Sequence, residues 1–257
     1  MTTFIEKIKS FATTKINIME VCGTHTMAIA SSGIKSLLPK NINLISGPGC
    51  PVCVTPAGII DSAIELAKNG CIIATFGDML KVPGSISSLE KEKSSGCDIR
   101  IVYSAGDSVK IAKNNPKKEV VFVGVGFETT APTIAATVKI ADKEKIKNFS
   151  VIPAFKLIPP ALKIILEQKK IKIDAFILPG HVSAIIGSQP YGFISEKFYT
   201  PAVITGFEPS DILEGIFSIL KQIKSNKPEI EIQYKRAVKP QGNPFAVKLL
   251  YSVFEET

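Results

Sequence analysis

The sequence alternates short apolar runs with segments long enough to form helices. Eight of the runs have the length of a β-strand, and they cover residues 16–23, 42–49, 71–77, 99–104, 119–126, 148–154, 174–180 and 201–208. Amphipathic or helix-length segments lie before and between them, at 4–12, 58–69, 105–114, 131–143, 160–170 and 210–224. Strands that alternate with helices predict parallel sheets that are covered on both faces.

The chain also shows weak internal repetition. Residues 21–26 resemble 125–130, 44–50 resemble 176–182, and 74–80 resemble 203–213. A length of 257 residues allows one large domain or two small ones. We therefore predict an α/β fold of two similar parallel-sheet domains that face each other across a cleft. The predicted domains are residues 1–117 and 118–257, with the boundary in the polar stretch that contains Pro116.

Composition excludes several classes of protein. Hydrophobic residues are 45% and charged residues 21%, which is ordinary globular composition and excludes a disordered chain, a coiled coil or a fibre. The net charge is +8, but Arg100 and Arg236 are the only arginines, so a nucleic-acid partner is not predicted. No run approaches the ~20 apolar residues of a membrane span. The first residues carry no apolar signal core, and we expect a cytoplasmic protein with no membrane partner.

Cys22 follows the first predicted strand, in the sequence CGTHT. Gly23 allows a tight turn, and Thr24 or Thr26 is expected to cap the helix that follows. A thiol near a helix N-terminus has a lowered pKa, which suits a nucleophile or a soft-metal ligand. His25 can donate to a bound group or add a ligand. The alternative is that Cys22 is a small buried hydrophobic residue.

Cys50 and Cys53 form a C-x-x-C motif in GPGCPVC, between prolines that restrict the backbone. This spacing serves a reversible dithiol, or half of a zinc or iron–sulfur site. Two unrelated core cysteines are the alternative. Cys71 and Cys97 offer no second paired spacing, so zinc is disfavoured, and both are treated as incidental.

Other polar residues also follow predicted strands, where open α/β sheets bind their ligands. His181 comes after a Pro-Gly turn and is either functional or structural. Glu128 and Glu208 stand beside glycine turns, and each is either a site residue or a helix cap. Asp78 is expected to be a cap or first-turn acid that complements the helix dipole.

Six motifs in this order resemble the hydrogenase maturation factor HypD family: CGTHTMAIA, SGPGCPVCVTP, TFGDMLKVPGS, VGFETTAPT, PGHVSAIIG and GFEPSDIL. The resemblance runs from about residue 18 to the C-terminus. It implies a scaffold that assembles the Fe(CN)2CO group of [NiFe]-hydrogenases with a HypC-like chaperone, which supplies a second thiolate, and a HypE-like cyanide donor.

The resemblance also implies roles for individual residues. Cys22 is the expected iron ligand, with Thr24 and His25 close by and His25 as a possible second ligand. Cys50 and Cys53 are the expected redox dithiol, and Glu128 and His181 are expected to line the cleft. The backbone positions assigned to cofactor binding are Gly23, Gly49 and Gly180.

This sequence departs from the family pattern at its C-terminal end. Members usually continue into four cysteines that hold a [4Fe–4S] centre. No cysteine follows Cys97 here, so that cluster is expected to be absent from this chain. Two other functions stay open: a stand-alone dithiol oxidoreductase, in which Cys50 and Cys53 turn over, and a non-catalytic module that binds partners.

Overall fold

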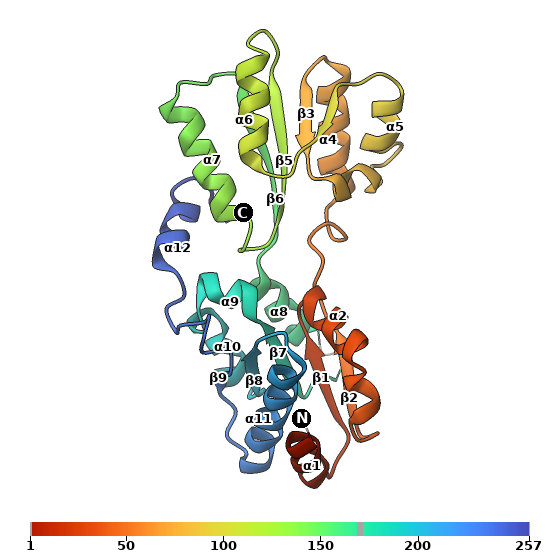
Figure 1. Ribbon diagram of the computed structural model, residues 1–257, viewed down its shortest axis with the longest axis vertical. Coiled ribbons are helices and arrows are strands. Elements are labelled where there is room, and N and C mark those ends of the chain that lie inside the picture. The colour runs from red at the N-terminus through yellow and green to blue at the C-terminus, as the bar shows by residue number, and fades with distance from the viewer. Residues whose placement is uncertain (1, 169–171, 257) are drawn as a thin grey trace. The chain divides into compact units, whose positions relative to one another are not determined.

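Two parallel β-sheets organise the computed structural model, which describes residues 2–168 and 172–256 (Figure 1). They belong to two compact units that are not continuous in sequence. Unit 1 comprises Met1–Cys50 and Leu157–Pro244, and unit 2 comprises Pro51–Lys156 and Phe245–Thr257. The predicted α/β class with two parallel sheets is therefore confirmed.

Unit 1 contains a five-stranded sheet in the order β2-β1-β7-β8-β9, with every neighbouring pair parallel. Its strands are β1 (Ile16–Glu20), β2 (Ile42–Ser46), β7 (Ala175–Pro179), β8 (Ala202–Thr205) and β9 (Ile230–Ile232). Its helices are α1 (Thr2–Phe11), α2 (Gly23–Ser32), α3 (Ile34–Leu37), α8 (Ile158–Glu167), α9 (Gly180–Ile186), η2 (Gln189–Tyr191), α10 (Gly192–Glu196) and α11 (Pro209–Ser225).

Unit 2 contains a four-stranded parallel sheet in the order β4-β3-β5-β6. Its strands are β3 (Ile72–Thr75), β4 (Ile99–Ile101), β5 (Val120–Gly126) and β6 (Phe149–Phe155). Its helices are α4 (Ala57–Lys68), η1 (Gly77–Lys81), α5 (Leu89–Ser94), α6 (Ala105–Asn114) and α7 (Ala131–Lys143), followed near the chain end by α12 (Pro244–Tyr251).

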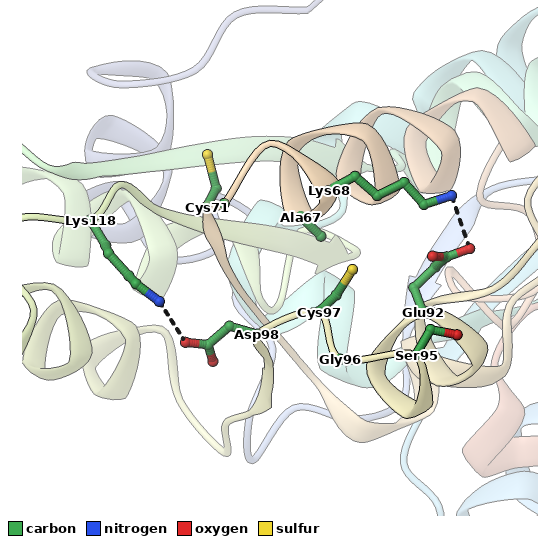
Figure 2. A pocket seen from close by; sticks show the side chains of 10 residues that line it. Ala67, Lys68, Cys71, Glu92, Ser95, Gly96, Cys97, Asp98 and Lys118 are labelled. Carbon is green, nitrogen blue, oxygen red and sulfur yellow. Dashed lines mark ion pairs between the residues drawn. The ribbon is translucent and has the colours of Figure 1, made fainter.

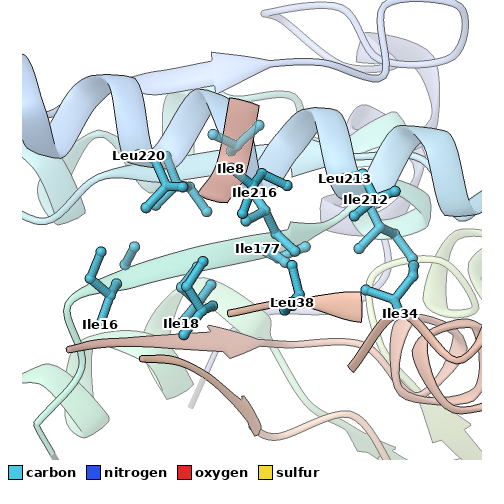
Figure 3. Close-up of a cluster of buried hydrophobic side chains, with 14 of the residues drawn as sticks. Ile8, Ile16, Ile18, Ile34, Leu38, Ile177, Ile212, Leu213, Ile216 and Leu220 are labelled. Carbon is cyan, nitrogen blue, oxygen red and sulfur yellow. The ribbon is translucent and has the colours of Figure 1, made fainter. Parts of the chain in front are cut away.

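The core of unit 1 is rich in isoleucine (Figure 3). β-Branched side chains pack well on a pleated sheet, and Ile18 of β1 and Ile177 of β7 are fully buried. Helix α11 carries apolar residues at helical spacing, which include Ile212, Ile216 and Ile219, and this stripe packs against the strands. Ile8 of α1 completes the cluster.

The eight strand positions predicted from sequence are confirmed, but the division into domains is wrong. The expected boundary at 117–118 lies inside unit 2, in the turn between α6 and β5. The amide of Asn148 ties that turn together by donating to the carbonyls of Ala112, Asn115 and Lys118, at 2.9–3.0 Å. Its polar residues therefore build a local turn and do not form a linker.

The pairing of β1 with β7 explains how the chain divides into the two units. β7 pairs with β1 although more than 150 residues separate them, so the N-terminal strands belong with the second half of the chain. β9, which lies outside the eight predicted runs, adds a fifth strand to the sheet of unit 1. Residues 44–50 and 176–182 each contain the end of a strand of the same sheet, β2 or β7, so they are not counterparts in two domains.

The helix expected at 160–170 begins at Ile158 and ends at Glu167. Residues 169 and 170 of that prediction lie outside the described residues. Across the described part of the chain, no helix combines the length and apolar character needed to cross a membrane.

Candidate functional site

Cys22 lies just beyond the carboxyl end of β1, at the N-cap of α2. Its backbone is extended, with φ −157° and ψ 126°, and its side chain makes no capping hydrogen bond. The thiol is free and partly exposed. The expectation that Thr24 or Thr26 caps this helix is wrong, because Cys22 holds the cap position and Thr24 lies in the first turn, exposed.

Glu20, the last residue of β1, binds Cys22 through its side chain. The residue is 2% exposed. One oxygen accepts the Cys22 amide at 3.3 Å, and the other accepts the Thr26 hydroxyl at 2.6 Å. Glu20 was not predicted as a site residue, although an acidic residue at the end of a buried strand is a signal that the sequence carries. Glu20 ties the residue that carries the thiol to the first turn of α2.

The GPGC segment packs directly against this turn. The Gly47 amide donates to the Glu20 carbonyl at 2.7 Å. A Cβ on Gly49 would lie 2.6 Å from the Gly23 nitrogen and 3.1 Å from the Cys22 carbonyl carbon. Gly49 is therefore required for backbone contact between the two motifs, and Gly23 is its partner in that contact. Cofactor binding by Gly23 and Gly49 stays a prediction.

Cys50 and Cys53 lie in the turn that follows, and both are disulfide-bonded. The other three cysteines of the chain are free, so the bond joins the two cysteines of the motif. The C-x-x-C segment can therefore form the oxidised state of a dithiol pair.

His25 is fully buried beside β8. Its Nε2 lies 3.0 Å from the Gly206 carbonyl oxygen and 2.9 Å from the Thr205 hydroxyl. Because a carbonyl oxygen only accepts, Nε2 carries the proton. Burial lowers the pKa of His25 to about 4, so the ring is neutral near pH 7 and Nδ1 has a free lone pair. Among the described residues, no group donates a hydrogen bond to Nδ1.

Phe207 connects the two histidines of the chain. Its ring stacks on His181 with centroids 4.0 Å apart, and its centroid lies 4.7 Å from that of His25. His181 lies in the first turn of α9 with its side chain exposed, and burial of part of the ring lowers its pKa. Both histidines were predicted from the sequence as site residues, but Phe207 was not. An aromatic residue after a strand is more typical of a hydrophobic core than of a site.

Close backbone contact also explains Gly180, the first residue of α9. A Cβ there would lie 2.5 Å from the Thr205 carbonyl oxygen and 2.9 Å from the Tyr234 ring. The small residue lets the β7–α9 turn pack against the end of β8. A role for Gly180 in binding a cofactor stays a prediction.

A network of charged side chains, Asp211 and Arg236, supports the turn between β8 and α11. Asp211 is 4% exposed and receives two hydrogen bonds from Arg236, which holds the pKa of the Asp211 carboxyl below its usual range. Asp211 also accepts the Glu208 amide at 3.3 Å. Glu208 is thus the N-cap residue of α11, which was one of the two roles considered for it. Neither Asp211 nor Arg236 was predicted from the sequence as part of the site.

The remaining acidic candidates belong to unit 2. Glu128 follows β5 and is 2% exposed, while Cys22, His25 and His181 follow strands of the other sheet. Its role in a site shared with His181 stays a prediction. Asp78 lies in the first turn of η1, as the sequence predicted.

Cys71 and Cys97 line a pocket of about 500 Å³ in unit 2 (Figure 2). The pocket walls carry two ion pairs, Lys68–Glu92 at 3.2 Å and Lys118–Asp98 at 3.6 Å. Cys71 precedes β3 and Cys97 precedes β4, so the pocket is at the amino ends of these strands. Ligands of open α/β sheets bind at the opposite, carboxyl ends.

No group of three or more His, Cys, Asp or Glu side chains is arranged to hold a metal ion in the residues that the structure describes. The Cys22 region therefore offers one partly exposed cysteine and one buried imidazole, three residues further along the chain, with no closed metal cage among the described residues. Such an arrangement can bind a metal only if other ligands complete its coordination.

Comparison with known proteins gives a match over the whole sequence. A family model described as "HypD: Hydrogenase formation hypA family" matches residues 1–257. A protein of Methanocaldococcus jannaschii that is named for hydrogenase expression and formation is 47% identical over 253 residues, which are 98% of this chain and 70% of the relative.

Two bacterial relatives are similar over nearly as much of the chain. Hydrogenase maturation factor HypD2 of Bradyrhizobium diazoefficiens is 47% identical over 92% of this chain and 64% of its own length. Hydrogenase maturation factor HypD of Escherichia coli is 45% identical over 93% of this chain and 64% of its own length. The chain thus spans about two thirds of the relatives that it matches.

Proposed function

Because the chain belongs to the HypD family of hydrogenase maturation factors, we propose that it is a scaffold on which the Fe(CN)2CO group of [NiFe]-hydrogenase is assembled. The observation that carries the proposal is the position of Cys22. Its free, partly exposed thiol stands at the helix N-cap beyond the carboxyl end of β1, where open α/β sheets bind ligands.

In this proposal the Cys22 thiolate holds the iron. Soft thiolate sulfur suits an iron ion that carries cyanide and carbon monoxide. The iron is cargo that passes to the hydrogenase, and its own diatomic ligands fill coordination positions. The absence of a three-residue metal cage in the described residues is therefore compatible with a cargo site. A HypC-like chaperone supplies the second thiolate, and a HypE-like protein delivers cyanide.

Cys50 and Cys53 are the proposed electron store. Reduction of their disulfide takes up two electrons and two protons and gives two thiols, and reoxidation returns them. Gly49 precedes this pair and contacts the backbone of Cys22 and Gly23, which supports a link between the dithiol and the iron ligand. Thr24, His25, Glu128 and His181 are the remaining proposed site residues.

The iron–sulfur cluster that the family resemblance implies has no matching ligand set in this sequence. Cys71 precedes β3 and Cys97 precedes β4 in unit 2, and no cysteine follows Cys97 in this sequence. No step proposed here passes through such a cluster.

A dithiol oxidoreductase is the second candidate function, and the bonded state of Cys50 and Cys53 favours it. The two functions differ in what they require. The scaffold must carry iron with cyanide and carbon monoxide, whereas the oxidoreductase needs only disulfide turnover.

The test is to co-express the chain with HypC-like and HypE-like partners and to record the infrared spectrum of the purified complex. The scaffold function predicts bands from bound cyanide and carbon monoxide. A spectrum without these bands, combined with steady turnover of a disulfide substrate, would favour the oxidoreductase.

A further inference from the structure

We propose that Gln233 is a positioning residue for His25 and that it acts through the backbone of Gly206, whose N–H and C=O groups belong to successive peptides. The side-chain oxygen of Gln233 accepts the Gly206 amide at 3.1 Å. The carbonyl oxygen of Gly206 in turn accepts His25 Nε2–H at 3.0 Å. The inference rests on the proposed function only in that His25 belongs to the Cys22 site.

The Gln233 amide can take only one orientation. Its nitrogen donates to Asp211 Oδ1 at 3.0 Å and to Glu214 Oε2 at 2.9 Å. Ionised carboxylates only accept hydrogen bonds, so the NH2 group must face them and the oxygen must face Gly206. Arg236 fixes Asp211 through paired hydrogen bonds, so the anchor of the amide is itself held in place.

The Gly206 backbone between Gln233 and His25 has little freedom to move. A Cβ on Gly206 would lie 2.1 Å from Asp211 Oδ2, so the backbone packs directly on that carboxylate. The next residue, Phe207, stacks against His181 and lies beside His25. A shift of the Gly206 backbone would therefore disturb both the hydrogen bond to His25 and the ring packing.

The consequence is a single tautomer of His25. With Nε2 protonated and the ring neutral, Nδ1 presents a buried lone pair that no described residue satisfies. Buried polar atoms nearly always have hydrogen-bond partners. The unsatisfied Nδ1 lone pair therefore indicates a place where a hydrogen-bond donor or the iron cargo binds. Metal-binding imidazoles commonly donate their second N–H to a backbone carbonyl, which fixes the ring in this way.

The experiment reads the tautomer by nitrogen NMR on the full chain labelled with ring ¹⁵N-histidine. The chain has two histidines, so His181→Gln assigns the signals of His25. We expect the wild type to show one tautomer, with the proton on Nε2 and a bare Nδ1. A wild-type ring that is protonated on Nδ1, or a mixture of tautomers, would overturn the proposal.

Gln233→Met keeps the side-chain volume and removes the amide, and the predicted result is loss of the single-tautomer pattern. Gln222→Met is the matched control. Gln222 is a buried glutamine of unit 1 that bonds Glu231 and the Glu229 amide, with no link to Gly206. An unchanged His25 spectrum in Gln233→Met, or the same change in both variants, contradicts the proposal.

Gln233→Glu provides a second variant if Gln233→Met does not fold. It replaces the NH2 group that anchors the amide by an oxygen that faces the Asp211 and Glu214 carboxylates, so it should also disturb the single tautomer. An unchanged wild-type tautomer in a folded Gln233→Glu protein counts against the proposal. The spectra need no iron and no partner protein, so their failure is distinguishable from failure of the scaffold function.

Discussion

The amide of Cys22 donates a 3.3 Å hydrogen bond to the buried carboxylate of Glu20, two residues earlier in the chain. The other oxygen of the same carboxylate accepts the Thr26 hydroxyl. A strand end, a helix cap and the first helical turn are thus joined by one acidic side chain. The conformation of the thiol-bearing residue depends on this side chain.

Replacement of Glu20 by alanine should therefore destabilise unit 1. Loss of two hydrogen bonds to a charged acceptor is expected to lower the free energy of unfolding by about 2–4 kcal/mol. Urea unfolding followed by circular dichroism measures this change. Glu6→Ala, which removes an exposed glutamate of α1, is the control and should change stability by less than about 0.5 kcal/mol. Equal stability of the two variants would show that Glu20 does not support the turn.

Gly49→Ala tests the contact between the two motifs. The new Cβ would meet backbone atoms of Gly23 and Cys22, and backbone cannot rotate away as a side chain can. We expect destabilisation of about 1–3 kcal/mol by overpacking. Gly58→Ala is the matched control, since a Cβ there meets nothing within 4 Å and lies in helix α4. It should be neutral or stabilising by up to ~1 kcal/mol. A stable Gly49→Ala protein contradicts the predicted contact.

Stability should fall as the pH is lowered from about 6.5 to 4 because of His25. The folded chain has a lowered His25 pKa of about 4, and the unfolded chain has the ordinary value of 6.5. The unfolded state therefore binds more protons in this window, so the free energy of unfolding rises with pH through it. The full effect is on the order of 3 kcal/mol.

Urea midpoints at pH 7 and pH 4.5 measure this dependence. His25→Gln should remove most of the slope, and His181→Gln should leave most of it. Carboxylates with lowered pKa values, such as Asp211, lose their contribution as the pH falls towards and below their ordinary pKa of 3.8, mostly outside this window. A slope that survives His25→Gln would contradict the assignment.

The redox state of the motif predicts a count of reactive thiols. Protein that is kept oxidised, unfolded and alkylated without reductant should carry label on Cys22, Cys71 and Cys97 only. Prior reduction should add Cys50 and Cys53. Peptide mass spectrometry distinguishes the five positions. Label on Cys50 or Cys53 without reduction would show that the pair does not form the disulfide under these conditions.

Sequence alone predicted the central strands well because β3, β5, β7 and β8 are buried along their whole length and are therefore apolar. The edge strand β9 was missed because Glu229, Glu231 and Gln233 alternate with its two isoleucines, so no continuous apolar run marks it. The domain boundary failed for a different reason. Pairing of β1 with β7 is a long-range event, and no local property of residues 50–51 or 156–157 announces that the chain changes unit there.

The candidate site shows the same division between local and long-range signals. Cys22, His25 and His181 could be selected from sequence because cysteine and histidine are scarce and chemically distinctive. Phe207 and Gln233 could not, since their roles depend on His25, which lies more than 180 residues earlier in the chain. Gly49 was predicted as a cofactor position, and the structure gives it a packing role.

The most direct test of the account is the infrared spectrum of the complex formed with HypC-like and HypE-like partners, compared between Cys22→Ala and Cys71→Ala. Both positions carry free, partly exposed thiols, but only Cys22 is the proposed iron ligand. The account predicts that the cyanide and carbon monoxide bands persist in Cys71→Ala and vanish in Cys22→Ala. Bands of undiminished intensity in the Cys22→Ala complex would contradict the claim that this thiolate holds the iron.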